Sequence, residues 1–313
     1  MTPHRTPIAV FAYRRPDHVR RMLASLAQCA GLDSCDVHIF CDGAKNPADA
    51  DAVAATRAVV RKWAATHGAN AVERTGNLGL AKSIVSAVSD LVEHHGRVIV
   101  IEDDLILSRD FLSFMLAGLD RYEDEERILQ ISGFAFTTGH PTETDAAFLP
   151  HASTWGWATW RRAWRHFRWE PQGVDAITNK SVERRFNLDD AYPYSTLLVE
   201  RLAGRNDSWG ILWYWSMFRA NGLVIFPRES LVCVGGADGS GTHCREGSHE
   251  AGMQTLGTIR PGGLAWPEAV TCDEDLWRAV KEHLRNTRPG SSRKRNWLAK
   301  LSSWMQPARS PGA

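Results

Sequence analysis

Along the first third of the chain, short apolar runs alternate with longer segments in which apolar residues recur at a helical spacing. Three short, almost wholly apolar runs are typical of buried strands: residues 8–12, 37–41 and 98–101. Between them, apolar residues recur at the i, i+3, i+4, i+7 spacing of amphipathic helices: residues 16–26, 47–67 and 80–91. This β-α-β-α-β order predicts a mostly parallel sheet that carries helices on both faces.

The pattern becomes less regular further along the chain. We expect four more elements: a helix ending near Tyr122, a strand over 128–132, a helix over 209–221 and a strand over 223–226. Gly222 is the expected stop of the third element. Residues 235–252, which contain several Gly and His residues, are expected to form a loop. The sequence therefore predicts an α/β protein whose second half is built from shorter elements.

The amino-acid composition is that of a soluble globular protein. The chain has 313 residues, of which 43% are hydrophobic and 23% charged, as in soluble globular proteins. The formal net charge is +1, but seven of the 37 Lys and Arg residues follow Glu282 and none of the 36 acidic residues does. The body is thus mildly acidic, which argues against nucleic-acid binding.

The six cysteines show no paired metal-ligand spacing, and no apolar run approaches the ~20 residues that span a bilayer. Residues 1–7 are polar and no apolar signal segment follows them, so we expect a cytoplasmic protein with reduced thiols.

The tail over 287–313 has its own pattern. Five apolar residues fall on one helical face after a basic triplet: Trp297, Leu298, Leu301, Trp304 and Met305. A helix of this kind suits peripheral contact with the inner face of an anionic membrane. A disordered, solubilising tail is the alternative.

Three adjacent carboxylates, Glu102, Asp103 and Asp104, follow the apolar run at 98–101. Like charges this close repel one another unless a cation compensates them. Hard divalent cations take oxygen ligands, and open α/β sheets bind ligands at the carboxyl ends of their strands. The triplet therefore predicts a site for Mn²⁺ or Mg²⁺ and a phosphate-bearing substrate. A solvated acidic turn is the alternative, which the buried strand disfavours.

Several motifs of other enzyme classes are absent from the sequence: G-x-G-x-x-G after the first strand, G-x-x-x-x-G-K-[ST], G-x-S-x-G and H-E-x-x-H. Their absence disfavours a dinucleotide enzyme, a P-loop enzyme, a serine hydrolase and a zinc protease.

Four segments, taken in order, resemble nucleotide-diphospho-sugar glycosyltransferases of the GT-A fold: residues 10–16, 41–43, 77–83 and 101–105. The Glu-Asp-Asp motif resembles that of the eukaryotic N-acetylglucosaminyltransferase I family. The rest is similar to bacterial family-2-like transferases of surface-polysaccharide synthesis. The resemblance covers roughly residues 6–245 and implies a Rossmann-like mixed sheet flanked by helices, with nucleotide and acceptor sites fused in one domain. The expected parts are a nucleotide-sugar-binding half (1–135), an acceptor-binding half (136–250), an extension (251–286) and the tail (287–313).

The resemblance also implies roles for residues on the donor side. Asp104 would coordinate the metal, Asp103 would hold ribose or assist the metal, and Glu102 would face the donor sugar. The other implied donor-binding residues are Arg14, Arg15, Asp42, Asn77 and Lys82. Asp42 would read a uracil edge, although it is also a natural turn residue before Gly43. Lys82 would approach the diphosphate or, alternatively, lie in solvent.

On the acceptor side, the resemblance implies an aromatic loop and helix over 151–160. Three tryptophans would contact sugars, with core packing as the alternative: Trp155, Trp157 and Trp209. Asp207 would be the catalytic base, or an N-cap of the next helix, with Asp189 and Asp190 as substitutes. His243 would add a metal or phosphate ligand.

These expectations describe an inverting, metal-dependent glycosyltransferase. It would move a sugar from a nucleotide diphosphate, UDP favoured, to a glycan or lipid-linked acceptor. One rival is a nucleotidyltransferase, although residues 12–16 lack the glycine such enzymes carry after strand one. A second rival is a non-catalytic carbohydrate-binding protein, which the complete set of acids disfavours.

Overall fold

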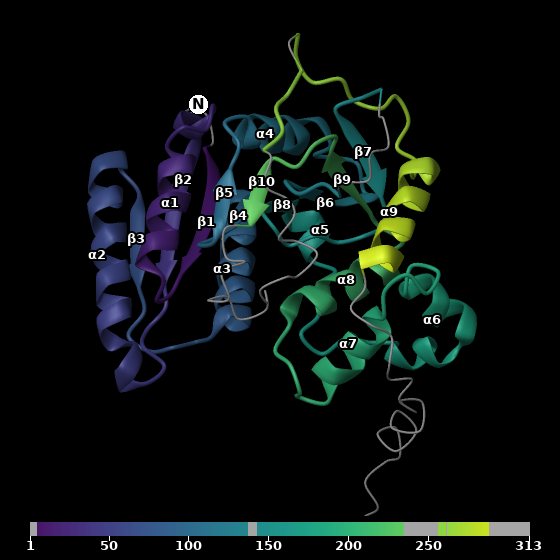
Figure 1. The fold of residues 1–313 in the computed structure, drawn as a ribbon, viewed down its shortest axis with the longest axis horizontal. Coiled ribbons are helices and arrows are strands. Elements are labelled where there is room, and N and C mark those ends of the chain that lie inside the picture. Colours follow the sequence, from purple (N-terminus) through teal and green to yellow (C-terminus); the bar gives the residue numbers. More distant parts are fainter. Residues whose placement is uncertain (1–4, 137–142, 235–255, 261, 288–313) are drawn as a thin grey trace, which may run out of the picture.

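A computed structural model describes residues 5–136, 143–234, 256–260 and 262–287 (Figure 1). Its main sheet has eight strands in the order β3-β2-β1-β4-β8-β6-β9-β7, and β10 and β5 form a separate antiparallel pair. The sheet is mixed and helices flank it, so the predicted fold class is confirmed.

The first half follows the predicted order closely. Its strands are β1 (Thr6–Ala12), β2 (Cys35–Cys41), β3 (Asn70–Glu73) and β4 (Arg97–Glu102), all parallel. Its helices are α1 (Pro16–Leu26), α2 (Ala50–His67) and α3 (Leu80–His95). The chain lays down β1, β2 and β3 in one direction and then crosses back, so that β4 pairs with the other side of β1. Because such crossovers are right-handed, this reversal puts α3 on the opposite face from α1 and α2, as predicted.

The second half extends the sheet with shorter strands. They are β6 (Ile128–Ser132), β7 (Ala146–Leu149), β8 (Trp157–Trp160) and β9 (Leu223–Pro227), while the small pair is β5 (Leu105–Leu107) and β10 (Val232–Val234). β8 runs antiparallel between β4 and β6. The aromatic loop and helix expected over 151–160 is therefore wrong for its second part, because residues 157–160 are a fully buried central strand.

The remaining helices pack around this part of the sheet: α4 (Phe111–Arg121), α5 (Arg161–Trp164), α6 (Lys180–Phe186), α7 (Tyr194–Leu202), α8 (Trp209–Arg219) and α9 (Glu274–Thr287). α8 ends close to its predicted stop, but Asn221 takes the left-handed conformation, with φ of 50°. Gly222 is needed for a different reason, since a Cβ there would lie 2.2 Å from the Leu129 side chain. Among the described residues, no helix has both the length and the apolar character to cross a bilayer.

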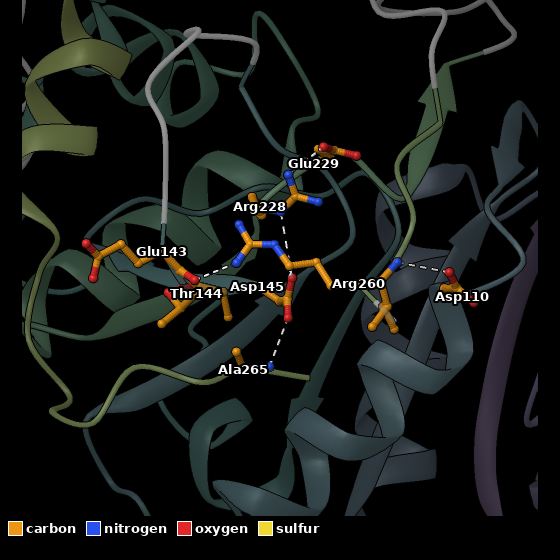
Figure 2. Close-up of polar contacts among 10 residues, drawn as sticks. Asp110, Glu143, Thr144, Asp145, Arg228, Glu229, Arg260 and Ala265 are labelled. Carbon is orange, nitrogen blue, oxygen red and sulfur yellow. Dashed lines mark hydrogen bonds and ion pairs between the residues drawn. The ribbon is translucent and has the colours of Figure 1, made fainter. Parts of the chain in front are cut away.

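The extension after β10 is fastened to the sheet by a cluster around the buried Asp145 (Figure 2). One carboxylate oxygen accepts a hydrogen bond from the Ala265 backbone N–H at 2.9 Å. The other oxygen lies 3.7 Å from the Nε of Arg228 and 3.5 Å from the Nε of Arg260. Arg260 also donates to the Glu143 carbonyl oxygen at 2.5 Å. A single buried carboxylate therefore joins three separate segments of the chain.

Candidate functional site

The strand order fixes one place where a ligand crevice is expected. β1 lies between β2 and β4, and the direction of the connections reverses there. The register pairs Phe11 with Glu102 and Ala12 with Cys41, so these three strands end at the same edge. In open α/β sheets, ligands bind outside the carboxyl ends of strands at such a switch point.

The acidic triplet lies at this switch point, and Arg15 meets it from the end of β1. The guanidinium of Arg15 donates from Nη1 to Oδ2 of Asp104 at 3.1 Å and from Nη2 to Oδ1 of Asp103. All three side chains are largely buried: Arg15 is 20% exposed, Asp104 15% and Asp103 7%. One arginine therefore bridges two of the three predicted acids.

The electrostatics of the triplet reflect crowding in a place that water hardly reaches. Burial, followed by the Asp104 and Asp103 carboxylates, raises the pKa of Glu102 to about 8. Burial also raises the pKa of Asp103, and Arg15 opposes that rise. For Arg15, burial alone would lower the pKa, but Asp103 and then Asp104 outweigh it and raise the pKa. The raised pKa of Glu102 favours its protonated form, so the triplet without a bound cation carries less negative charge than three ionised carboxylates would.

The carboxylate oxygens of the triplet fit a hard divalent cation, but the protein would supply only part of its coordination shell. Across the described part of the chain, no three acidic, His or Cys side chains converge as a ready metal cluster. Asp104, with Asp103 beside it, therefore offers one or two carboxylates rather than a full cage. Mg²⁺ in particular is usually held this way, with water and substrate phosphates completing the shell.

Asp42, expected to read a base, has a different set of contacts. Its carboxylate accepts backbone hydrogen bonds from Leu78, at 2.9 and 3.1 Å, and from Gly79, at 2.9 Å. Asn77 in turn donates from Nδ2 to the Gly43 carbonyl oxygen at 2.8 Å, which connects the same two loops. A Cβ on Gly43 would lie 2.6 Å from the Gly76 backbone, so only glycine fits between the two loops. These contacts favour a positioning role for Asp42 and Asn77: they hold the 77–79 loop in front of α3.

The structure separates the two adjacent arginines. Arg14 points to Asp49, with 2.5 Å between Nη1 and Oδ1, and the Tyr13 hydroxyl donates to the same carboxylate at 2.8 Å. Only Arg15 reaches the triplet. Lys82 is exposed in the first turn of α3. The sequence predicted donor contacts for both arginines, and their different partners are visible only in the folded loop after β1.

The three tryptophans expected at the acceptor fall into two groups. Trp157 is fully buried and Trp209 is 5% exposed, and their rings stack with centroids 5.3 Å apart. These contacts favour the packing alternative for both. Trp155 is half-buried and lines a cavity of about 210 Å³. Because Trp157 pairs with Val100, Trp155 lies at the same sheet edge as the triplet.

Asp207 is exposed in the loop before α8. The N-cap of that helix is Ser208, whose Oγ accepts from the Ile211 N–H at 3.3 Å. The capping alternative for Asp207 is therefore wrong. Ser208 also lines the cavity, and Asp207 is the residue that precedes Ser208 in the sequence. Asp189, a substitute for the base, pairs instead with Lys281 at 2.7 Å. His243 and the tail beyond 287 lie outside the described residues.

Sequence reasoning missed His151, Tyr192, Tyr194 and Tyr214, which form much of the cavity wall. These residues come from separate segments around β8, α7 and α8, and no local spacing connects them. The crowding of aromatic residues in the second half was the only available signal.

No model of a protein family matches the chain. Solved structures with a similar fold include S. aureus TarS 1–349, at 12% identity over 73% of this chain and 59% of that one, with a TM-score of 0.44. Another TarS structure is matched over 25% of its length, so this chain spans about a quarter of that protein. Mouse xyloside xylosyltransferase 1 is matched at 10% identity over 70% of this chain and 84% of that one, with a TM-score of 0.38.

A glucosyl-3-phosphoglycerate synthase from Mycobacterium tuberculosis, solved with Mn²⁺, UDP and glucosyl-3-phosphoglycerate, is matched at 14% identity over 52% of this chain and 59% of that one. Its TM-score is 0.33. Cytidylyltransferase-type proteins are also among the similar structures. At such identities and TM-scores, the likeness carries no statement about activity.

Proposed function

We propose that the protein is an inverting, metal-dependent glycosyltransferase of bacterial surface-polysaccharide synthesis. Its donor would be a nucleotide-diphosphate sugar, with UDP favoured, and its acceptor a glycan or lipid-linked glycan. The observation that carries this proposal is the Arg15–Asp103–Asp104 arrangement at the switch point of the sheet. It offers carboxylate oxygens for a cation at the carboxyl ends of the strands, where open α/β sheets bind their ligands.

The donor side follows from the contacts of the triplet. Asp104, assisted by Asp103, would hold Mn²⁺ or Mg²⁺ against the diphosphate. When bound, such a cation supplies positive charge that stabilises the leaving nucleoside diphosphate. Glu102 would face the sugar, and the 77–79 loop that Asp42 holds would bring the N-terminus of α3, with Lys82, toward the phosphates.

On the acceptor side, Asp207 would accept the proton of the attacking hydroxyl. The hydroxyl oxygen then bonds to the anomeric carbon as the bond from that carbon to the diphosphate oxygen breaks, and the configuration inverts. General-base assistance of this kind is typically worth about 10²–10⁴ in rate. The exposed loop before α8 leaves Asp207 accessible to an acceptor.

The proposal is tested by incubating the full chain with Mn²⁺ and a panel of UDP-, GDP- and TDP-sugars. We expect slow, metal-dependent hydrolysis of one donor type and binding of its nucleoside diphosphate. Absence of both donor hydrolysis and nucleoside-diphosphate binding would refute the proposal. Pyrophosphate release from a nucleoside triphosphate would identify a nucleotidyltransferase, and glycan binding unaffected by EDTA, without nucleotide binding, would identify a carbohydrate-binding protein.

A further inference from the structure

Among the described residues that line the cavity beside Trp155, none is Asp, Glu, Lys or Arg, and most are aromatic or aliphatic. Its aromatic residues include Phe134, Trp155, Tyr192, Tyr194 and Tyr214. His151 is 5% exposed, and burial lowers its pKa to about 3, so the imidazole is neutral at physiological pH.

Polar atoms nevertheless occur in this wall. Within the described residues, the Nδ1 of His151 and the Oγ of Ser153 are buried and have no hydrogen-bond partner. The Nε2 of His151 lies 3.3 Å from the Tyr194 hydroxyl. Buried polar atoms are rarely left unpaired, so each unpaired one calls for an explanation such as a water molecule or a ligand. The cavity thus combines flat apolar faces with a few neutral hydrogen-bonding groups.

The wall is held in place from behind by a turn between α6 and α7. Leu188, Asp189 and Asp190 all have positive φ, at 55°, 54° and 66°. Such a run persists only where surrounding contacts over-determine it. Two contacts do so: Asn187 and Ser195 exchange hydrogen bonds of 2.9 and 2.8 Å, and Asp189 is tied to α9 through Lys281.

This strained turn leads directly into Tyr192 and Tyr194, which line the cavity, and α9 adds Leu284 to the same wall. The cavity is therefore formed in part by three helices, α7, α8 and α9, and by a turn, none of which belongs to the sheet. We conclude that its shape is formed before any ligand binds, as is usual for small-molecule sites.

Size and charge together restrict the ligand. About 210 Å³ is less than the roughly 300–1,000 Å³ of sites for drug-sized molecules, which leaves room for about one ring. An anion would lose its hydration without gaining a cation or a charged hydrogen bond from the wall.

We infer that this cavity binds a neutral pyranose unit of the acceptor and discriminates against the corresponding uronate. The term acceptor rests on the proposed function, whereas the preference for an uncharged ring rests on the cavity alone. Trp155 would stack on the apolar face of the ring, and the hydroxyl of Tyr194, which lies 3.3 Å from His151 Nε2, would meet a ring hydroxyl.

The test compares matched ligand pairs by saturation-transfer NMR on the full chain, without metal or nucleotide. The neutral members are methyl glycosides of glucose, galactose, mannose and N-acetylglucosamine, and phenol serves as an apolar probe. The charged members are the methyl glycosides of the uronic acids that correspond to glucose, galactose and mannose, with the carboxylate free. We expect at least one neutral pyranoside to bind ten times or more tightly than its uronate. Equal binding within every pair, phenol binding without any pyranoside binding, or no pyranoside binding at all would overturn the inference.

Two variants test whether the selected pyranoside binds in this cavity. Trp155→Ala should weaken the selected pyranoside at least tenfold, and Tyr194→Phe, which keeps the ring and removes the hydroxyl beside His151, should weaken it several-fold. Trp169→Ala is the matched control, because Trp169 is 38% exposed and does not line the cavity. Unchanged affinity in both cavity variants would overturn the inference.

Separate titration of UDP, GDP and TDP, each with Mn²⁺, distinguishes this inference from the proposed function. If none of these nucleoside diphosphates binds while neutral pyranosides bind selectively, the glycosyltransferase proposal fails and the sugar site stands. If one of them binds and no pyranoside does, the reverse holds.

Discussion

Arg15→Gln should make the protein less stable and improve its binding of divalent metal. The guanidinium is 20% exposed and bridges two carboxylates that are 7% and 15% exposed. Removing one partner of a buried ion pair costs about 3–5 kcal/mol, because the remaining charge is left uncompensated. Since Arg15 keeps some contact with water, we expect the low end, a loss of about 3 kcal/mol in the free energy of unfolding without metal.

The same substitution frees Asp103 and Asp104 for a cation. With the guanidinium removed, Mn²⁺ no longer competes with a resident positive charge, and we expect its Kd to fall at least tenfold, or by about 1.4 kcal/mol. At Mn²⁺ concentrations 100 times this Kd, binding returns about 2.7 kcal/mol of stability. Saturating metal should therefore restore most of the stability that the variant loses.

The assay is urea unfolding followed by tryptophan fluorescence, with and without Mn²⁺, together with electron paramagnetic resonance of free Mn²⁺. Arg14→Gln is the matched control, because its partner Asp49 lies outside the triplet and Arg14 is 54% exposed. Asp49 is 7% exposed and keeps the Tyr13 hydroxyl as a donor, so the control should cost about 1 kcal/mol or less. Weaker Mn²⁺ binding in Arg15→Gln, or an equal loss of stability with and without Mn²⁺, would refute the reasoning.

Three further predictions concern the scaffold. The pKa of His151 lies at about 3 in the folded protein and at 6.5 in the unfolded chain, so the unfolded state gains a proton first as the pH falls. The free energy of unfolding should therefore decrease by about 2 kcal/mol between pH 7 and 5. His151→Gln should remove this part of the pH dependence, as measured by urea unfolding. Asp145→Asn should lower the free energy of unfolding by about 2 kcal/mol, since Arg228 and Arg260 lose their buried carboxylate but retain some solvent contact. Asp42→Ala leaves the Leu78 and Gly79 N–H groups without their acceptor, so it should cost about 2–3 kcal/mol and weaken UDP binding about tenfold in a calorimetric titration.

Each of these three predictions has a contrary result. An unchanged acid dependence in His151→Gln would show that another group controls it. A change below about 0.5 kcal/mol in Asp145→Asn would mean that the cluster of Figure 2 contributes no more than surface charge. Full UDP affinity in Asp42→Ala would separate the 77–79 loop from the donor site.

The first half of the fold was predictable because its signals are local. The apolar runs at 8–12, 37–41 and 98–101 became β1, β2 and β4 with only slightly different ends. By contrast, β3 (Asn70–Glu73) is a half-exposed edge strand of four residues, too short to show a period of its own. β8 was hidden for the opposite reason: both of its faces are buried, so its sequence does not alternate.

The site was predictable as a place but only partly as a set of contacts. Three acids after a buried strand and the carboxyl-end rule together located it. The acids that Arg15 contacts lie 88 and 89 residues further along the chain, so no local pattern shows that Arg15 rather than Arg14 reaches the triplet. In the same way, Asp42 contacts a loop 36 residues away, so its positioning role is visible only in three dimensions.

We propose that Asp104 holds a cation against the diphosphate of a nucleotide and that Asp207 acts on the acceptor hydroxyl in the transfer step. Calorimetric titration of UDP with Mn²⁺ into the wild type, Asp104→Ala and Asp207→Ala tests the first part directly. We predict metal-dependent binding in the wild type and in Asp207→Ala, and its loss in Asp104→Ala. Metal-dependent UDP binding that persists undiminished in Asp104→Ala would contradict the account.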